Sequence, residues 1–188
     1  MKIVAFTMLI LASASVWKKP ADAQPEPPRE LTAREKVLKV AGSQVGIKER
    51  TGKNDGEVEK YIASVGLDPT AGYPYCAAFT YWCGCEALGK DNPYPKSAWS
   101  PDTVKGGRRV NSGTEIQGAE TFGIYNALRK RIAHTGFVEK RVGSHLITIE
   151  ANTSANAAVG SEADREGQGV YRKRRHIKTV RTIKDWHQ

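Results

Sequence analysis

The hydrophobic pattern of this chain changes its period once, and this change restricts the fold classes open to the chain. Helical spacing comes first, over residues 32–46, 57–65 and 76–88. Strand-like segments follow, over residues 121–125, 132–141, 146–151 and 170–174. Helices followed by strands predict an α+β domain in which N-terminal helices pack on an antiparallel β-sheet. Residues 91–117 are rich in Pro, Ser, Gly and Asn, so we expect an irregular segment between the two parts.

The N-terminal end has the features of a secretory signal peptide. Lys2 precedes an apolar run over residues 3–16 that is short for a membrane crossing, and Ala21-Asp22-Ala23 is typical of a cleavage site. We expect a signal peptide over residues 1–23, an extended linker over 24–31 and one domain over 32–188. This organisation predicts export to the periplasm or the extracellular space, with no stable membrane insertion after cleavage. An uncleaved N-terminal anchor is the alternative.

The charge balance favours anionic partners. The formal net charge is +9, from 29 Lys and Arg against 20 Asp and Glu. An excess of this kind attracts nucleic acid, acidic lipid or an acidic polymer. The basic stretch after Val170 lacks the interleaved aromatic residues or the known module that nucleic-acid binding requires, so we expect no nucleic-acid partner. A solvated strand face and attraction to an anionic cell wall both remain open for this stretch.

Three cysteines, Cys76, Cys83 and Cys85, lie within one predicted helix. An odd number in an exported protein leaves at least one thiol without an intramolecular partner. Seven residues of helix separate Cys76 from Cys83 by roughly 10 Å, which exceeds the reach of a disulfide. Cys76 opens the helix, where free N–H groups and the helix dipole favour a thiolate. Cys76 is therefore a candidate nucleophile, with a buried core cysteine as the alternative, whereas Cys83 and Cys85 read as core residues.

A cysteine nucleophile requires an imidazole nearby and a third group that orients it. His134 lies inside an apolar strand-like segment and precedes Gly136, which leaves room for a substrate backbone. A hydrogen-bonded core histidine is an equally good reading of His134 by itself. Glu150 and Asn152 are two residues apart in the next strand and share one of its faces, so either could bind the ring of His134.

The pairing register between these two strands decides whether the three groups can meet. A two-residue turn at Gly143-Ser144 with regular pairing places His134 and Glu150 on opposite faces of the sheet. A three-residue loop, or a bulge in either strand, returns both side chains to one face. On a shared face we favour Glu150 as the orienting group, because a carboxylate stabilises an imidazolium better than an amide does.

These segments together resemble the CHAP domains, a family of cysteine- and histidine-dependent amidohydrolases and peptidases with a papain-like arrangement. The matching segments are Tyr75–Phe79 with Trp82, His134–Val138 and Thr148–Thr153, together with Val45–Glu49 and Gly169–Arg172. The likeness runs in order over about residues 32–174, with Ala151 where the family usually has Gly. The cysteine and histidine motifs are fairly specific in combination.

The resemblance implies a papain-like fold and hydrolysis of an amide through a thioester, with Cys76 as nucleophile, His134 as base and Glu150 or Asn152 as orienting group. It implies peptidoglycan as substrate, cut in the stem peptide, the cross-bridge or the N-acetylmuramoyl-alanine bond. We expect four residues to contact substrate: Tyr73, Tyr75, Gly136 and Trp99. Calcium-binding members carry an acidic loop before the cysteine, and the single carboxylate here, Asp68, predicts no metal and no cofactor.

Two other functions fit the same sequence. One is a non-catalytic cell-wall-binding module of the same fold, and the other is an exported antibacterial toxin with the same chemistry. We expect the protein to act as a monomer in each case.

Overall fold

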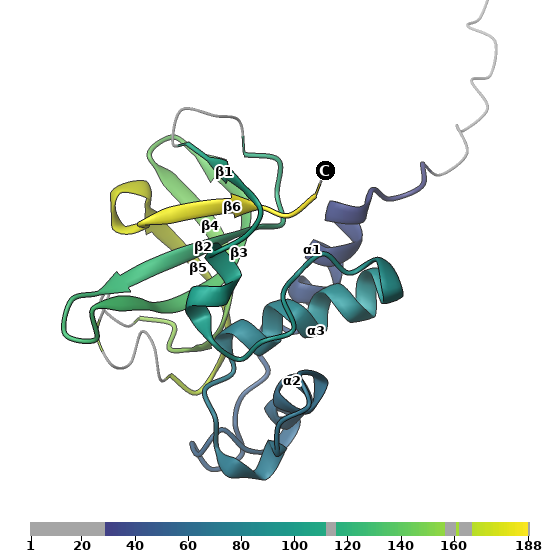
Figure 1. Cartoon of the computed structure of the whole chain (residues 1–188), viewed down its shortest axis with the longest axis vertical. Helices are drawn as coiled ribbons and strands as arrows, with labels where there is room; N and C mark the ends of the chain where they lie inside the picture. Colours follow the sequence, from purple (N-terminus) through teal and green to yellow (C-terminus); the bar gives the residue numbers. More distant parts are fainter. Residues whose placement is uncertain (1–28, 112–115, 157–160, 162–166, 188) are drawn as a thin grey trace, which may run out of the picture. The chain divides into compact units, whose positions relative to one another are not determined.

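Helices precede an antiparallel sheet along the chain, in the order that the hydrophobic pattern predicts (Figure 1). The computed structural model describes residues 29–111, 116–156, 161 and 167–187. Within these residues the α-helices are α1 (Ala33–Ser43), α2 (Glu59–Ser64) and α3 (Cys76–Leu88). The strands are β1 (Arg108–Val110), β2 (Glu120–Asn126), β3 (Arg131–Val142), β4 (His145–Thr153), β5 (Gly169–His176) and β6 (Thr182–Asp185). The predicted α+β class is confirmed.

The predicted signal peptide over residues 1–23 lies outside the described residues, as does most of the predicted linker. Among the residues that the structure does describe, no helix is long and apolar enough to span a membrane.

The first helix begins where the sequence predicts. The Thr32 side chain accepts a hydrogen bond from the backbone N–H of Glu35, and Oε2 of Glu35 accepts one from the backbone N–H of Thr32 at 2.8 Å. This capping box satisfies two N–H groups that the first turn leaves without helical partners. The helix ends at Ser43 and not at residue 46, because the chain turns away at Gly46, where φ is +100°.

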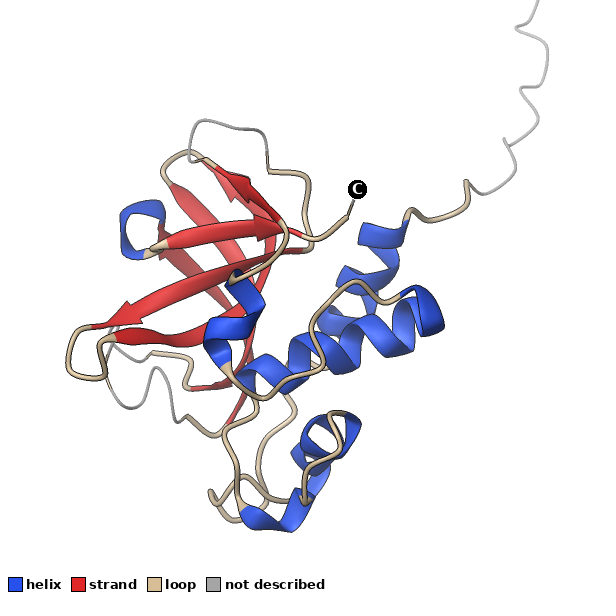
Figure 2. Cartoon of the chain, in the orientation of Figure 1, coloured by secondary structure: helices blue, strands red, loops and turns tan. Residues whose placement is uncertain are grey.

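The sheet has six antiparallel strands in the order β1-β6-β2-β3-β4-β5. Figure 2 draws the strands in red and the helices in blue. Apolar side chains on the two faces of the sheet belong to two separate hydrophobic clusters. Phe137 and Ile149 join a cluster with residues of α1, α2 and α3, whereas Phe122, Val138 and Leu146 belong to a second cluster. Because successive residues of a strand point to opposite faces, the helices cover one face and the second cluster lies on the other. The strands β2 to β4 are therefore buried on both faces.

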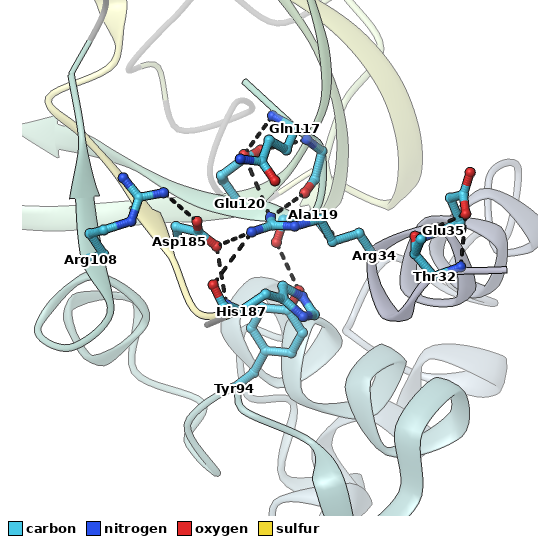
Figure 3. A network of polar contacts seen from close by, with 11 residues as sticks. Thr32, Arg34, Glu35, Tyr94, Arg108, Gln117, Ala119, Glu120, Asp185 and His187 are labelled. Carbon is cyan, nitrogen blue, oxygen red and sulfur yellow. Dashed lines mark hydrogen bonds and ion pairs between the residues drawn. The ribbon is translucent and has the colours of Figure 1, made fainter. Parts of the chain in front are cut away.

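Strands β1 and β6 were not predicted, and the expectation of an irregular segment over 91–117 is wrong for residues 108–110. Each of these short strands contributes a single buried apolar residue, Val110 and Ile183, so neither has a readable alternation. Long-range ionic contacts hold them in place instead, as Figure 3 shows. The carboxylate of Asp185 in β6 accepts hydrogen bonds from Arg34 of α1 and Arg108 of β1, each at 2.6 Å.

The same network links α1 and Tyr94 to the residues that precede β2. Arg34 also donates to the main-chain oxygen of Gly118 at 2.8 Å, and Tyr94 donates to that of Ala119 at 2.8 Å (Figure 3). Burial alone would raise the pKa of Asp185, but its hydrogen bonds to Arg34 and Arg108 lower it. The carboxylate therefore stays ionised and keeps its ionic contacts with α1 and β1.

Candidate active site

Cys76 occupies the first position of α3, as the sequence predicts. Its residue is 2% exposed, and a groove of about 530 Å³ opens beside it. The side chain of Tyr75, the residue before the helix, makes no capping hydrogen bond, so the first N–H groups of α3 are left to face the region around the sulfur. The helix terminus thus favours negative charge at the position of the thiol.

His134 and Glu150 lie on one face of the sheet and are in direct contact. Nε2 of His134 donates to Oε2 of Glu150 at 2.8 Å, and both residues are almost completely buried. The other ring nitrogen, Nδ1, forms no hydrogen bond of ordinary length among the described residues, although the imidazole is close enough to the Cys76 thiol to lower its pKa. Cys76, His134 and Glu150 are therefore neighbours in that order.

A bulge in β3 makes this contact possible. The hairpin turns at Gly143-Ser144, with Val142 paired to His145, which is the register that would separate His134 from Glu150. The pairing then shifts at Glu139, so that Val138 pairs with Thr148 and Phe137 with Ile149. One extra residue in β3 reverses the facing of every residue before it. The shared face that a triad requires comes from this bulge and not from a longer loop.

Two further groups hold the Glu150 carboxylate. Nε of Arg175 donates to Oε1 of Glu150 at 2.6 Å, and Nη2 of Arg175 donates to Oε2. The hydroxyl of Thr148 donates to Oε1 as well. Arg175 is 1% exposed, so this is a buried, two-pronged ion pair of the kind that fixes a carboxylate in one orientation.

Sequence reasoning missed Arg175. It lies in the basic run of β5, which offered a solvated strand face as one reading, and that reading is wrong at this position. The alternation of the strand contains the signal, because Arg174 is exposed while Arg175 points to the opposite face. Identifying the buried member required the pairing of β5 with β4, where Arg175 lies beside Leu146.

The charges in this cluster reinforce one another. Burial would raise the pKa of Glu150, but hydrogen bonds from Arg175 and His134 hold it well below its usual range. Burial would lower the pKa of His134, but its interactions with the nearby Cys76 thiol and with Glu150 raise it to about 9. Burial would likewise raise the pKa of Cys76, but the neighbouring imidazole of His134, assisted by Ser100, lowers it. The pKa of the thiol is lowered and that of the imidazole is raised, and both shifts favour a thiolate beside an imidazolium.

The segment before the 3-10 helix η4 (Ser100–Val104) forms one wall of the groove. Oγ of Ser100 lies 3.4 Å from Sγ of Cys76, and Trp99, which is 48% exposed, lines the groove next to it. Tyr73, which is 44% exposed, lines the groove as well. Two of the four residues expected to contact substrate are therefore at the groove surface.

The other two expectations are wrong. Tyr75 is fully buried, stacks against Tyr61 and donates to Oε1 of Glu49 at 3.0 Å, so its side chain belongs to the core. The space beside Gly136 is filled by β4, because an added Cβ would lie 2.7 Å from a main-chain oxygen and 3.0 Å from Cγ of Glu150. Gly136 thus makes room for Glu150 and not for a substrate backbone.

Asn152 is close to the cluster but does not hold the imidazole. It is fully buried at a φ of +58°, and the pairing of β4 with β5 shifts at this residue. The ring of His134 is hydrogen-bonded to Glu150 instead. Cys83 is fully buried in α3 and Cys85 is partly exposed; burial holds the pKa of Cys83 well above its ordinary value, so it is no nucleophile at neutral pH.

The arrangement can activate a sulfur nucleophile and return a proton to a leaving group, which is the chemistry of acyl transfer. In the described part of the chain, no three His, Cys, Asp or Glu side chains are grouped so as to hold a metal ion. Compared with known proteins, the chain matches no family model and no curated sequence.

Proposed function

We propose that the protein is a cysteine hydrolase of the papain-like CHAP type that cuts amide bonds of peptidoglycan. The observation that carries this proposal is the buried contact of His134 with Glu150 beside a cysteine at a helix N-terminus. A structural cysteine and a core histidine would not require a fully ionised Arg–Glu pair behind the imidazole. Such a pair costs desolvation free energy, and positioning a catalytic base accounts for that cost.

The proposed reaction proceeds through a thioester. The Cys76 thiolate attacks the amide carbonyl, and the negative charge moves to the carbonyl oxygen, where the backbone N–H of Cys76 can donate to it. The imidazolium of His134 then protonates the leaving amine as the C–N bond breaks. The now neutral imidazole takes a proton from a water molecule as its oxygen attacks the thioester carbonyl. The C–S bond then breaks, which releases the carboxylic acid and leaves the Cys76 thiolate beside the imidazolium of His134.

Glu150 and Arg175 act behind this chemistry. The carboxylate keeps Nε2 of His134 protonated and holds the ring plane, so that Nδ1 is presented to the sulfur. Arg175 and Thr148 in turn hold both carboxylate oxygens, which leaves the Glu150 side chain no other rotamer of similar energy.

Peptidoglycan as substrate is supported by the resemblance to the CHAP family and by the groove beside Cys76. The groove exposes two aromatic rings, Tyr73 and Trp99, at the surface where an acyl chain would lie. The predicted signal peptide would deliver the enzyme to the periplasm or outside the cell, where this substrate occurs.

The test is digestion of purified peptidoglycan by the chain from residue 24 onward. We expect soluble fragments from the wild type and none from Cys76→Ala. Cys85→Ala is the matched control, because Cys85 lies in the same helix but outside the site, and it should retain activity. Mass spectrometry of the fragments identifies the bond that is cut. Binding to peptidoglycan without release of any fragment would reject the hydrolase and identify a wall-binding module instead.

A further inference from the structure

Among the described residues that line the groove beside Cys76, two side chains are cationic and none is a carboxylate. Lys96 and Arg131 line it together with the rings of Tyr73 and Trp99. The remaining lining residues are apolar or neutral, and they are Val65, Leu67, Pro74, Cys76, Ser97, Ala98, Ser100 and Ala133. An apolar groove with cations at its wall attracts a ligand that is itself partly apolar and negatively charged.

Arg131 fixes the aromatic part of this wall. Its guanidinium carbon lies 3.9 Å from the centre of the Trp99 ring, which is a close cation–π contact. The indole therefore has a defined orientation although it is 48% exposed.

The segment that presents Lys96 is rigid. The hydroxyl of Ser97 accepts a hydrogen bond from the backbone N–H of Trp99 at 2.9 Å and donates to Asp102 at 2.6 Å. Asp102 is also bound by Lys105 at 2.7 Å, so the one carboxylate joined to this segment is already engaged with another lysine. Lys96 itself is exposed and lines the groove. Lys96 is thus presented at the groove by a stretch of backbone that these hydrogen bonds hold in place.

The same segment sets the distance between the ammonium and the reacting sulfur. Ser100, four residues after Lys96, lies beside Sγ of Cys76. Four residues of fully extended chain span at most about 14 Å. An anionic group bound by Lys96 therefore lies within a few residues of the carbonyl that Cys76 would attack.

We propose that the groove binds a peptide carrying a free carboxylate within about four residues of the scissile amide, with Lys96 as the carboxylate-binding residue and the Trp99–Arg131 stack as its apolar support. The position of the carboxylate relative to a cleaved bond rests on the proposed hydrolase function, whereas binding of the carboxylate to Lys96 does not. The site would discriminate against substrates in which the carboxylate is amidated, because a neutral amide forms no charge-assisted hydrogen bond with the ammonium.

The experiment compares two forms of one ligand. Soluble peptidoglycan fragments are acetylated at their amines, and half are then converted to primary amides at their carboxylates. Binding is measured by tryptophan fluorescence on the Cys76→Ala protein, so that no turnover occurs. We expect the unmodified fragments to bind about ten-fold more tightly than the amidated ones, the size of one charge-assisted contact.

Two variants made in the Cys76→Ala background assign the effect. Lys96→Gln should reduce the ten-fold preference to about two-fold or less, while Arg141→Gln, at the exposed far end of β3, should leave it unchanged. Equal affinity for both forms, or a preference that survives Lys96→Gln, would overturn the proposal. Digestion of the same fragments by the wild type is measured separately. If binding depends on the carboxylate but no fragment is digested, the hydrolase is rejected and the carboxylate site is not. If fragments are digested but both forms bind equally well, the carboxylate site is rejected and the hydrolase is not.

Discussion

Removing the imidazole should make Cys76 a much weaker nucleophile, and the structure sets the size of the effect. The His134→Ala variant loses the two largest causes that lower the pKa of Cys76, while burial, which raises it, remains. We therefore expect the pKa to return to at least its ordinary value of 9.0. A thiol with that pKa is only about 1% thiolate at pH 7, so lowering the pKa can raise the amount of the reactive form by at most about 100-fold.

Lower basicity offsets part of this gain. A thiolate of lower pKa is intrinsically less nucleophilic, with a Brønsted slope of about 0.4–0.5. The net expectation is therefore a fall of about three- to eight-fold in the rate of alkylation of Cys76 at pH 7. The pH at which the rate is half-maximal should move upward, because the thiolate now forms only near or above pH 9.

The assay is alkylation by iodoacetamide between pH 5 and pH 10, followed by mass spectrometry of each cysteine peptide. Cys83 and Cys85 serve as internal references, and in the wild type both should react more slowly than Cys76 at pH 7. The His145→Ala variant is the control, because His145 is in β4 at the hairpin turn, away from the thiol. Since the smaller side chain also opens space around the sulfur, the pH midpoint decides the outcome: an unchanged midpoint in His134→Ala would refute the thiolate–imidazolium pair.

Three other perturbations probe the same cluster. In Glu150→Gln the pKa of His134 should fall below about 9. Because hydrolysis requires the imidazolium to protonate the leaving amine, the activity should be lost at a lower pH on the alkaline side. A pH–rate profile of fragment release measures this shift, and an unchanged alkaline limb would contradict it. Arg175→Leu should lower the free energy of unfolding by about 3–5 kcal/mol, because it leaves a buried carboxylate without its cationic partner. Arg174→Gln, at an exposed position of the same strand, should change the free energy of unfolding by less than about 0.5 kcal/mol. Equal urea midpoints for the two variants would show that the buried pair contributes no stability. Gly136→Ala should destabilise the fold by about 1–3 kcal/mol, since the added methyl would come within 2.7 Å of a main-chain oxygen of β4, and a thermal midpoint equal to the wild type would show that β4 moves aside freely.

Local patterns in the sequence were enough to predict the helices and strands whose formation depends on residues close together in the chain. The capping box at Thr32, the apolar helix that begins at Cys76 and the alternation along β3 and β4 all depend on contacts within a few positions of the chain. The sequence also restricted the geometry of the site before any coordinates, because strand periodicity requires a bulge if a two-residue turn is to bring His134 and Glu150 together.

The tertiary structure alone decided the remainder, since each missing feature depends on residues far apart in the chain. Strand β6 is linked to α1 through the contact of Asp185 with Arg34, 151 positions away, and no residue near Asp185 indicates that partner. The location of the bulge at Glu139, the burial of Arg175 against Glu150 and the loss of Tyr75 to the core all follow from which strands and helices pack together. A sequence specifies the facing of a side chain relative to its neighbours, but the free energy of burying a charge or a ring is known only once the surfaces that cover it are in place.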